Sequence, residues 1–216
     1  MNDIQLIIFD LDGTLADSRF DLADAVNYAL EKLNKPLLSY EELPPLLGSG
    51  LSYLLQKATD TEDAQILQQA RQMFDEYYSR NYVKKTRCYP GVEETLATLP
   101  QIKKAVYSNK AQDFTEAIIR ELGLAPLFDK VMGAQPGRYP LKPDPAGIRL
   151  ILEELDIPPG KALMVGDSTH DMEAGKAAGL HTCAVTYGYR PAEVLKEAKP
   201  EFMIGAFAEL LELPLG

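Results

Sequence analysis

The chain has 216 residues, a formal net charge of -10 at pH 7 and a hydrophobic content of 46%. These values fit one large globular domain, or one domain with a smaller insertion, and the acidic charge disfavours nucleic acid and anionic membranes as partners. The two cysteines, Cys88 and Cys183, are too few for a disulfide framework and lack metal-ligand spacing. No signal peptide or membrane-spanning stretch is evident, so we expect a cytoplasmic protein.

The first half of the chain predicts one strand followed by helices alone. Residues 4–8 form an apolar, β-branched run that is typical of a buried parallel strand. From residue 17 to residue 86 the pattern is helical and shows no strand. The predicted helices span residues 18–34, 40–47, 51–58 and 61–82. The Cys-Tyr-Pro-Gly turn at residues 88–91 marks the end of this block.

The second half alternates strands with helices. The predicted strands span residues 104–107, 130–132, 162–165, 182–185 and a short edge strand at 203–204. The predicted helices span residues 92–99, 112–122, 145–155, 172–178 and 207–213. Such alternation predicts a parallel sheet with helices on both faces, which also includes the first strand.

The predicted fold class is therefore α/β, a doubly wound parallel sheet with a Rossmann-like core and a small all-helical cap domain inserted after the first strand. We assign residues 1–16 and 87–216 to the core domain and residues 17–86 to the cap domain. Hinges are expected where the chain passes between them, at residues 15–18 and 86–90.

Two carboxylates follow the first predicted strand. Asp10 and Asp12 face the same way in an extended chain, because residues two apart share a side. Buried carboxylates at this place require a cation nearby. Gly13 allows a sharp turn close to a ligand, and Thr14 adds a hydroxyl. The alternative interpretation is a polar loop in which these residues only form a turn.

Polar groups follow other strands of the same predicted sheet. Ser108-Asn109-Lys110 follows the second strand of the core, and Gly166-Asp167-Ser168 with Asp171 follows the strand at 162–165. Lys142 precedes a proline at the start of a helix. Taken singly, these could be a turn, a surface lysine and helix-dipole partners. Together, at the carboxyl edge where open parallel sheets bind ligands, they predict one active site.

These four clusters resemble the motifs of the haloacid dehalogenase-like superfamily. The helical insertion after the first motif resembles its helical-cap subgroup, and within that subgroup the chain is similar to phosphoglycolate phosphatases. Supporting matches are Lys142-Pro143-Asp144-Pro145, residues 174–179 and Thr186-Tyr187-Gly188-Tyr189. The resemblance covers essentially the whole chain and implies a phosphatase that hydrolyses a small phosphate monoester, with 2-phosphoglycolate as the expected substrate.

The expected cofactor is Mg²⁺, since the clustered groups are hard oxygen ligands without a histidine or cysteine cluster. The resemblance implies Asp10, Asp167 and the backbone carbonyl of Asp12 as its ligands, with Asp171 in support. It also implies that Asp10 is the nucleophile, forming an aspartyl phosphate, and that Asp12 is the general acid and base. The second aspartate favours phosphoryl transfer, because a dehalogenase of this superfamily lacks it.

The remaining expected contacts concern the substrate. The resemblance places Ser108, Lys142 and backbone N–H groups near Gly13 and Asn109 around the transferring phosphoryl group. Thr14 belongs to the same expected phosphate site. In the cap, Gly48 and Ser49 lie where the family has a specificity loop, although a plain interhelical turn is the alternative.

The carboxylate of 2-phosphoglycolate requires a basic partner, but residues 42–47 contain none. Candidates lie elsewhere in the cap: Lys57, Arg71, Arg80, Lys84 and Lys85. His170 is expected in an exposed loop and His181 at a strand edge, and neither is assigned a catalytic role.

Three alternatives to this substrate remain: another small phosphate ester or pyrophosphate, a hexose-phosphate mutase on the same site, and a non-enzymatic phospho-aspartate receiver module. The receiver is disfavoured, because it needs only about 120 residues and no helical insertion. The sequence leaves monomer and homodimer equally open. The expected partner is a small-molecule phosphate ester.

Overall fold

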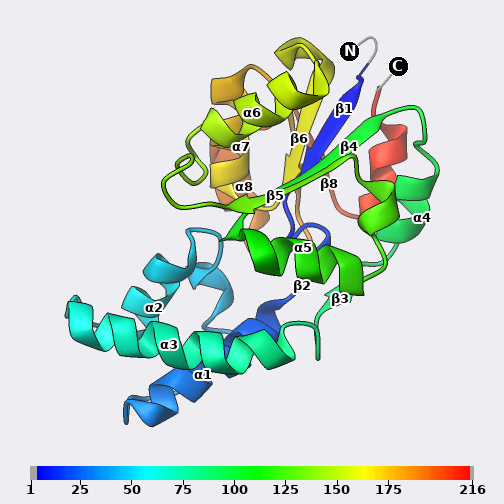
Figure 1. The fold of residues 1–216 in the computed structure, drawn as a ribbon. Coiled ribbons are helices and arrows are strands. Elements are labelled where there is room, and N and C mark those ends of the chain that lie inside the picture. Colours follow the sequence, from blue (N-terminus) through cyan, green and yellow to red (C-terminus); the bar gives the residue numbers. More distant parts are fainter. Residues whose placement is uncertain (1–3, 215–216) are drawn as a thin grey trace.

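A computed structural model describes residues 4–214 of the chain, and its centre is a six-stranded sheet (Figure 1). The strand order is β5-β4-β1-β6-β7-β8, and each neighbouring pair runs parallel. The strands are β1 (Leu6–Phe9), β4 (Lys103–Ala111), β5 (Lys130–Ala134), β6 (Ala162–Gly166), β7 (His181–Val185) and β8 (Phe202–Ile204). The chain order switches sides at β1, so the carboxyl ends of β1, β4 and β6 meet at the switch point.

Helices cover both faces of this sheet, which confirms the doubly wound fold (Figure 1). Successive side chains of β1 alternate between the two faces. Ile7 and Phe9 pack into the core cluster that includes α4 (Val92–Ala97), α5 (Gln112–Glu121) and the 3₁₀ helix η4 (Phe207–Glu212). Leu6 and Ile8 pack against α6 (Ala146–Leu155) and α7 (Thr169–Ala178). Burial on both sides explains why this strand reads as a continuous apolar run.

The remaining core elements complete the sheet's cover. They are η2 (Ala125–Leu127), α6 (Ala146–Leu155), η3 (Pro159–Lys161), α7 (Thr169–Ala178), α8 (Ala192–Glu197) and η4 (Phe207–Glu212). The last of these is a 3₁₀ helix, so the helix predicted for residues 207–213 has the tighter form. None of the helices in the described part of the chain is both long and apolar enough to cross a membrane.

The first four helical segments lie together beyond the carboxyl edge of the sheet (Figure 1). They are α1 (Arg19–Lys32), η1 (Pro44–Leu46), α2 (Leu51–Thr59) and α3 (Ala64–Asn81). Their buried side chains form a cluster of their own, built around Leu30, Leu54 and Phe74. A separate hydrophobic cluster is what an inserted cap requires.

Two helix predictions in this region were wrong in detail. The helix predicted for residues 40–47 is only the 3₁₀ turn η1, because its two prolines supply no backbone N–H donors. Helix α3 begins at Ala64 rather than Thr61. Asp63 caps it by accepting hydrogen bonds from the backbone N–H groups of Gln65 and Ile66.

The segments that join the helices to the sheet form a small ribbon that the sequence did not predict. Strand β2 (Ala16–Asp17) pairs antiparallel with β3 (Arg87–Cys88). Thus the expectation of no strand from residue 17 onward was wrong at Asp17. Nearby, the buried Asp21 carboxylate accepts hydrogen bonds from the backbone N–H groups of Lys85 and Thr86 at 2.8–3.0 Å. The two segments that join the helical insertion to the sheet therefore lie side by side and are held together by hydrogen bonds.

Candidate active site

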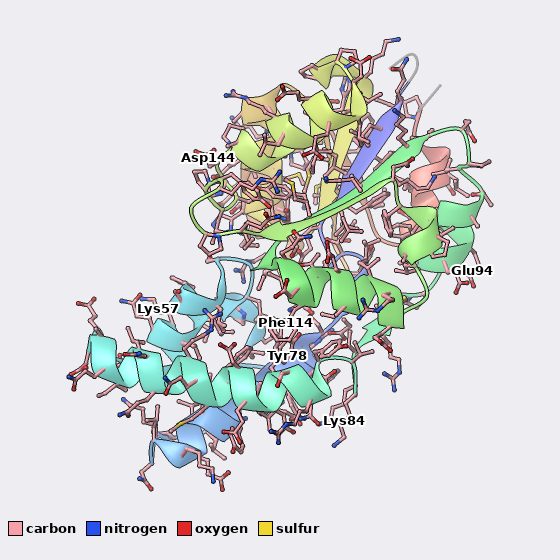
Figure 2. All side chains as sticks on the ribbon, in the orientation of Figure 1. Lys57, Tyr78, Lys84, Glu94, Phe114 and Asp144 are labelled. Carbon is pink, nitrogen blue, oxygen red and sulfur yellow. The ribbon has the colours of Figure 1, made fainter. Side chains whose placement is uncertain are left out.

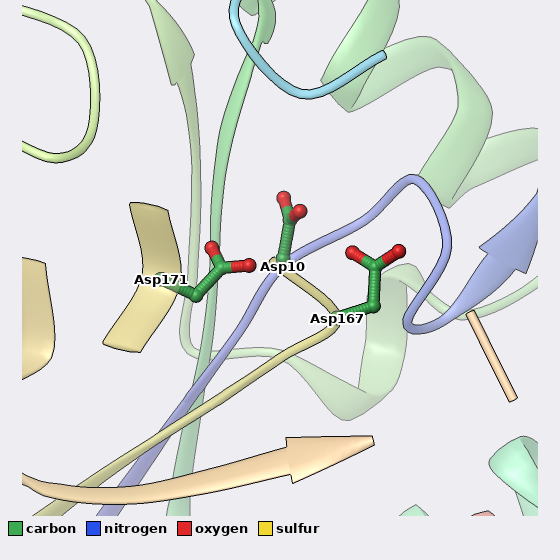
Figure 3. A group of neighbouring side chains, drawn as sticks. All are labelled: Asp10, Asp167 and Asp171. Carbon is green, nitrogen blue, oxygen red and sulfur yellow. The ribbon is translucent and has the colours of Figure 1, made fainter. Parts of the chain in front are cut away.

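Three carboxylates converge where β1 and β6 end (Figure 3). Asp10 follows β1, Asp167 follows β6, and Asp171 lies in the first turn of α7. The Asp10 N–H donates to the Val165 carbonyl at 2.9 Å, which ties the two strand ends together. One oxygen of each carboxylate lies within 4.8 Å of the others, and all three residues are buried. The predicted acidic cluster is therefore assembled.

Glycines make room for these carboxylates. Gly13 has a φ of 87°, in the left-handed region, and a Cβ placed there would overlap Oδ2 of Asp167. A Cβ on Gly188 would overlap the Cβ of the same aspartate, and one on Gly166 would overlap the Asp171 carboxylate. Larger residues at these positions would displace the acidic side chains, so the glycines help to set the site geometry.

The cluster carries more negative charge than the chain neutralises. Burial, together with the smaller effects of Asp171 and Asp12, raises the pKa of Asp10 to about 7, while Lys142 opposes the shift. Burial, followed by the neighbouring Asp10 and Asp171, raises the pKa of Asp167 well above its ordinary value. Charged carboxylates are therefore disfavoured here unless a further cation is present.

Lys142 is the protein's own counter-charge at this cluster. Its Nζ lies 2.9 Å from Asp10 Oδ1 and 2.7 Å from Asp171 Oδ1, and it donates to the Tyr107 carbonyl at 2.8 Å. Burial lowers the pKa of Lys142, but Asp10 and Asp171 outweigh that effect and the net shift is upward. The ammonium group is thus held charged between the two carboxylates.

The donor set fits a hard divalent cation. Three carboxylates with no histidine or cysteine among them match the oxygen ligands that Mg²⁺ prefers. The raised pKa values of Asp10 and Asp167 show that lysine alone does not compensate them. A cation bound between these two aspartates would supply the missing positive charge.

Cation binding is expected to compete with protons. Asp10, with its pKa of about 7, must lose a proton before it can act as a ligand. The dissociation constant for Mg²⁺ should therefore rise about tenfold or more per pH unit as the pH falls from 6.5 to 5.5. Calorimetric titration at several pH values checks this. A constant affinity across that range would contradict it, and Asp167→Asn should abolish binding throughout.

Asp12 lies beside the acidic cluster but has different partners. Its Oδ2 is 2.9 Å from Nζ of Lys110, and its Oδ1 accepts a hydrogen bond from the Ser18 hydroxyl. The Ser18 backbone N–H in turn donates a hydrogen bond to the Tyr189 hydroxyl at 2.9 Å. Both oxygens of Asp12 are therefore held by other partners, and its side chain is not one of the three carboxylates that converge.

Lys110 is a site residue to which the sequence assigned no role. Burial lowers its pKa, but Asp12 and Tyr78 together outweigh the effect, so the pKa is raised. Its Nζ also lies 5.2 Å from the centroid of the Tyr78 ring on α3. The Ser108-Asn109-Lys110 motif already placed this lysine next to the site. Strand β4 continues through the motif to Ala111, whereas the predicted strand ended at residue 107.

Of the other predicted phosphate-site residues, Ser108 and Thr14 are buried side chains with hydroxyl groups, and Asn109 holds neighbouring loops together. Ser108 is buried and lines the cavity described below. Thr14 is buried too, and its hydroxyl has no hydrogen-bond partner among the described residues. Asn109 joins two motifs, because its Nδ2 donates to the carbonyls of Gly48 and Lys142 while its Oδ1 accepts from the Lys142 N–H. Asn109 thus connects the loop of the helical insertion to the loop that carries Lys142.

A cavity of about 430 Å³ lies between the helical insertion and the sheet edge. Asp10, Asp12 and Ser108 line its floor at the sheet edge, and the loop with Gly48 and Ser49 lines it from the helical insertion. Apolar side chains form much of the wall. Tyr78 of α3 and Phe114 of α5 lie between these two helices (Figure 2), with their ring centroids 4.9 Å apart.

Contacts between the helical insertion and the loop after β7 were not predicted. The Arg190 guanidinium, which follows β7, donates to the carbonyls of Pro44 at 3.0 Å and Leu47 at 2.6 Å. The Tyr189 N–H donates to Asp167 Oδ2 at 2.7 Å, so one loop contacts both the acidic cluster and the cap. The sequence feature that could have indicated these contacts is the polar and aromatic run Tyr187-Gly188-Tyr189-Arg190 after the strand. His170 was expected in an exposed loop but is half-buried on α7.

Comparisons with known proteins agree with this site. The family model described as haloacid dehalogenase-like hydrolase matches residues 7–185. A phosphoglycolate phosphatase of Vibrio cholerae is 35% identical over 225 residues, covering 100% of this chain and 99% of the relative. One of Photobacterium profundum is 33% identical, covering 97% and 95% respectively. A crystal structure of a predicted phosphoglycolate phosphatase from Haemophilus somnus has a TM-score of 0.92 and 32% identity, covering 98% of each chain.

The fold and site, with these matches, define the class: the chain belongs to the haloacid dehalogenase-like hydrolase family. It is an enzyme, a hydrolase whose full-length relatives are phosphatases. The resemblance noted in the sequence is thereby confirmed.

Proposed function

We propose that this hydrolase is a Mg²⁺-dependent phosphatase that cleaves a small phosphate monoester, 2-phosphoglycolate, through an aspartyl-phosphate intermediate. The observation that carries the proposal is a buried group of three carboxylates whose member Asp10 lines the same cavity as Asp12, which is paired with Lys110. The substrate assignment is supported by relatives of that name at 33–35% identity over nearly the full chain.

Asp10 is the proposed nucleophile. It lines the cavity, and one of its oxygens is held by Lys142 at 2.9 Å. An oxygen of its carboxylate attacks phosphorus, the ester bond to the leaving oxygen breaks, and the phosphoryl group passes to Asp10. Mg²⁺ held by Asp10, Asp167 and the backbone carbonyl of Asp12, with Asp171 in support, would offset the charge of the phosphate.

Asp12 is the proposed proton carrier. It donates a proton to the leaving oxygen in the first step and takes one from the attacking water in the second. That water breaks the acyl-phosphate bond, which returns the Asp10 carboxylate and releases inorganic phosphate. Lys110 and Ser18 fix the Asp12 carboxylate on the cavity floor, where it can serve both steps.

The remaining groups bind and orient the phosphoryl oxygens. Ser108 offers a hydroxyl at the cavity floor, and Lys142 places a positive charge directly behind Asp10. The backbone around Gly13 and Asn109 is assigned to the same oxygens, as is the Thr14 hydroxyl, which has no hydrogen-bond partner among residues 4–214. Gly48 and Ser49 face the substrate from the cap. We further propose a cytoplasmic location and no macromolecular substrate.

The test is phosphate release with Mg²⁺ from a panel of 2-phosphoglycolate, hexose phosphates, nucleotides and pyrophosphate. We expect kcat/KM for 2-phosphoglycolate to exceed that of the other members by at least about tenfold. Preference for another ester would keep the chemistry and change the substrate. Conversion of a hexose 1-phosphate to its isomer would establish the mutase, and no release from any compound would overturn the proposal.

A further inference from the structure

The cavity holds few positive charges for a substrate with two anionic ends. Among residues 4–214, two cationic side chains line it, Lys110 and Arg71. Lys110 is paired with Asp12, and its side chain is only 7% exposed. Lys142 is buried between two aspartates, and the Arg190 guanidinium already donates hydrogen bonds to the carbonyls of Pro44 and Leu47. Arg71 on α3 is therefore the cation that remains for the leaving group.

The Arg71 guanidinium is held in place by one hydrogen bond, which leaves its other N–H donors free to bind a ligand. Its Nε donates to Asp75 Oδ2 at 2.6 Å, one helical turn away. Its two terminal NH₂ groups make no hydrogen bond to the described part of the chain, and the side chain is 48% exposed. A guanidinium held at Nε presents its two-pronged edge, which matches the two oxygens of a carboxylate.

The surroundings of Arg71 favour an ion pair with substrate. Phe74 and Tyr78 continue the same face of α3, and Phe114 and Leu141 line the same cavity. Apolar side chains on the cavity side of Arg71 shield a bound carboxylate from part of the solvent, which strengthens a charge-assisted hydrogen bond.

We propose that Arg71 is a specificity-determining residue that binds the carboxylate of the substrate's leaving group. The inference rests on the proposed function, since it assigns a partner to the carboxylate of 2-phosphoglycolate. Asp75 positions the guanidinium, and the phosphoryl end remains with Asp10 and Ser108 at the cavity floor. Arg71 thereby distinguishes carboxylate-bearing esters from neutral ones of the same size.

The test compares two substrates that differ only in this group. Ethylene glycol monophosphate replaces the carboxylate of 2-phosphoglycolate with a neutral hydroxymethyl group. In Arg71→Gln we expect kcat/KM for 2-phosphoglycolate to fall about 100-fold, mainly through KM, with little change for the neutral ester. Arg80→Gln, on the same helix but outside the cavity, is the matched control and should leave both values unchanged.

Each outcome bears on a different claim. A collapse of the substrate ratio in Arg71→Gln alone supports the inference. Equal loss for both esters, or an unchanged ratio while the wild type still prefers 2-phosphoglycolate, overturns the inference and leaves the proposed function standing. If the wild type hydrolyses the neutral ester but not 2-phosphoglycolate, the proposed substrate and the inference both fail. Thermal denaturation of each variant shows whether it is folded.

Discussion

Asp10→Asn should lower kcat with 2-phosphoglycolate by at least about 10⁴-fold, because an amide cannot supply the attacking oxygen anion. We expect the substitution not to lower the free energy of unfolding. Burial raises the pKa of Asp10 to about 7, so its folded-state contribution to stability is greatest at low pH and is lost as the pH rises through that value. At pH 8 without metal, a neutral asparagine should therefore be at least as stable as the wild type.

Two measurements separate these effects. Single-turnover phosphate release reports the chemical step, and urea denaturation in EDTA reports the free energy of unfolding. Asp12→Asn is the comparison variant, expected to lose about 10²–10⁴-fold in rate as a general acid and base would. Activity of Asp10→Asn near the wild-type level would remove Asp10 as the nucleophile. Lost activity together with lost folding would instead make its role structural.

Lys142→Met should destabilise the metal-free protein by about 3–5 kcal/mol at pH 8, because it leaves Asp10 and Asp171 buried without their counter-charge. The loss should be smaller at pH 5. Lys142 itself stays charged at both values, since its pKa is raised. Asp10 is mostly protonated below its pKa of about 7 and then needs no counter-charge.

Urea denaturation of Lys142→Met in EDTA at pH 8 and pH 5 checks this prediction. Lys84→Met is the matched control, because Lys84 is exposed, and its stability should differ from the wild type by less than about 0.5 kcal/mol. Equal losses at the two pH values would show that methionine disturbs packing instead of charge. No loss at either would show that the two aspartates do not depend on this lysine.

The core site could be predicted because its residues are placed by short-range patterns. An apolar strand followed by polar residues puts Asp10 and Asp167 at one edge of a parallel sheet, whatever the loops do. The capping box formed by the Ser168 hydroxyl and the Asp171 carboxylate is local too, but it was missed: the helix was predicted to begin at residue 172, and α7 begins at Thr169. Such signals need only a few neighbouring residues to be read.

The contacts between the cap and the core could not be predicted in this way. Arg190 contacts Pro44 and Leu47, which lie more than 140 residues earlier in the chain. The place of Arg71 on the cavity wall depends on how α3 rests against α5, and its local pattern indicates only a solvated helix face. Ribbon β2–β3 is two residues per strand, too short for any periodicity to appear.

That short ribbon has a consequence for how such enzymes diversify. Ala16 pairs with Cys88 and Asp17 with Arg87, so the points where the helical insertion begins and ends are neighbours in space. An insertion whose ends meet can be lengthened, exchanged or replaced by a tight turn without moving β1 or the residues that follow it. Gene fusion or recombination at this junction would give the same reaction centre a new recognition module in one event.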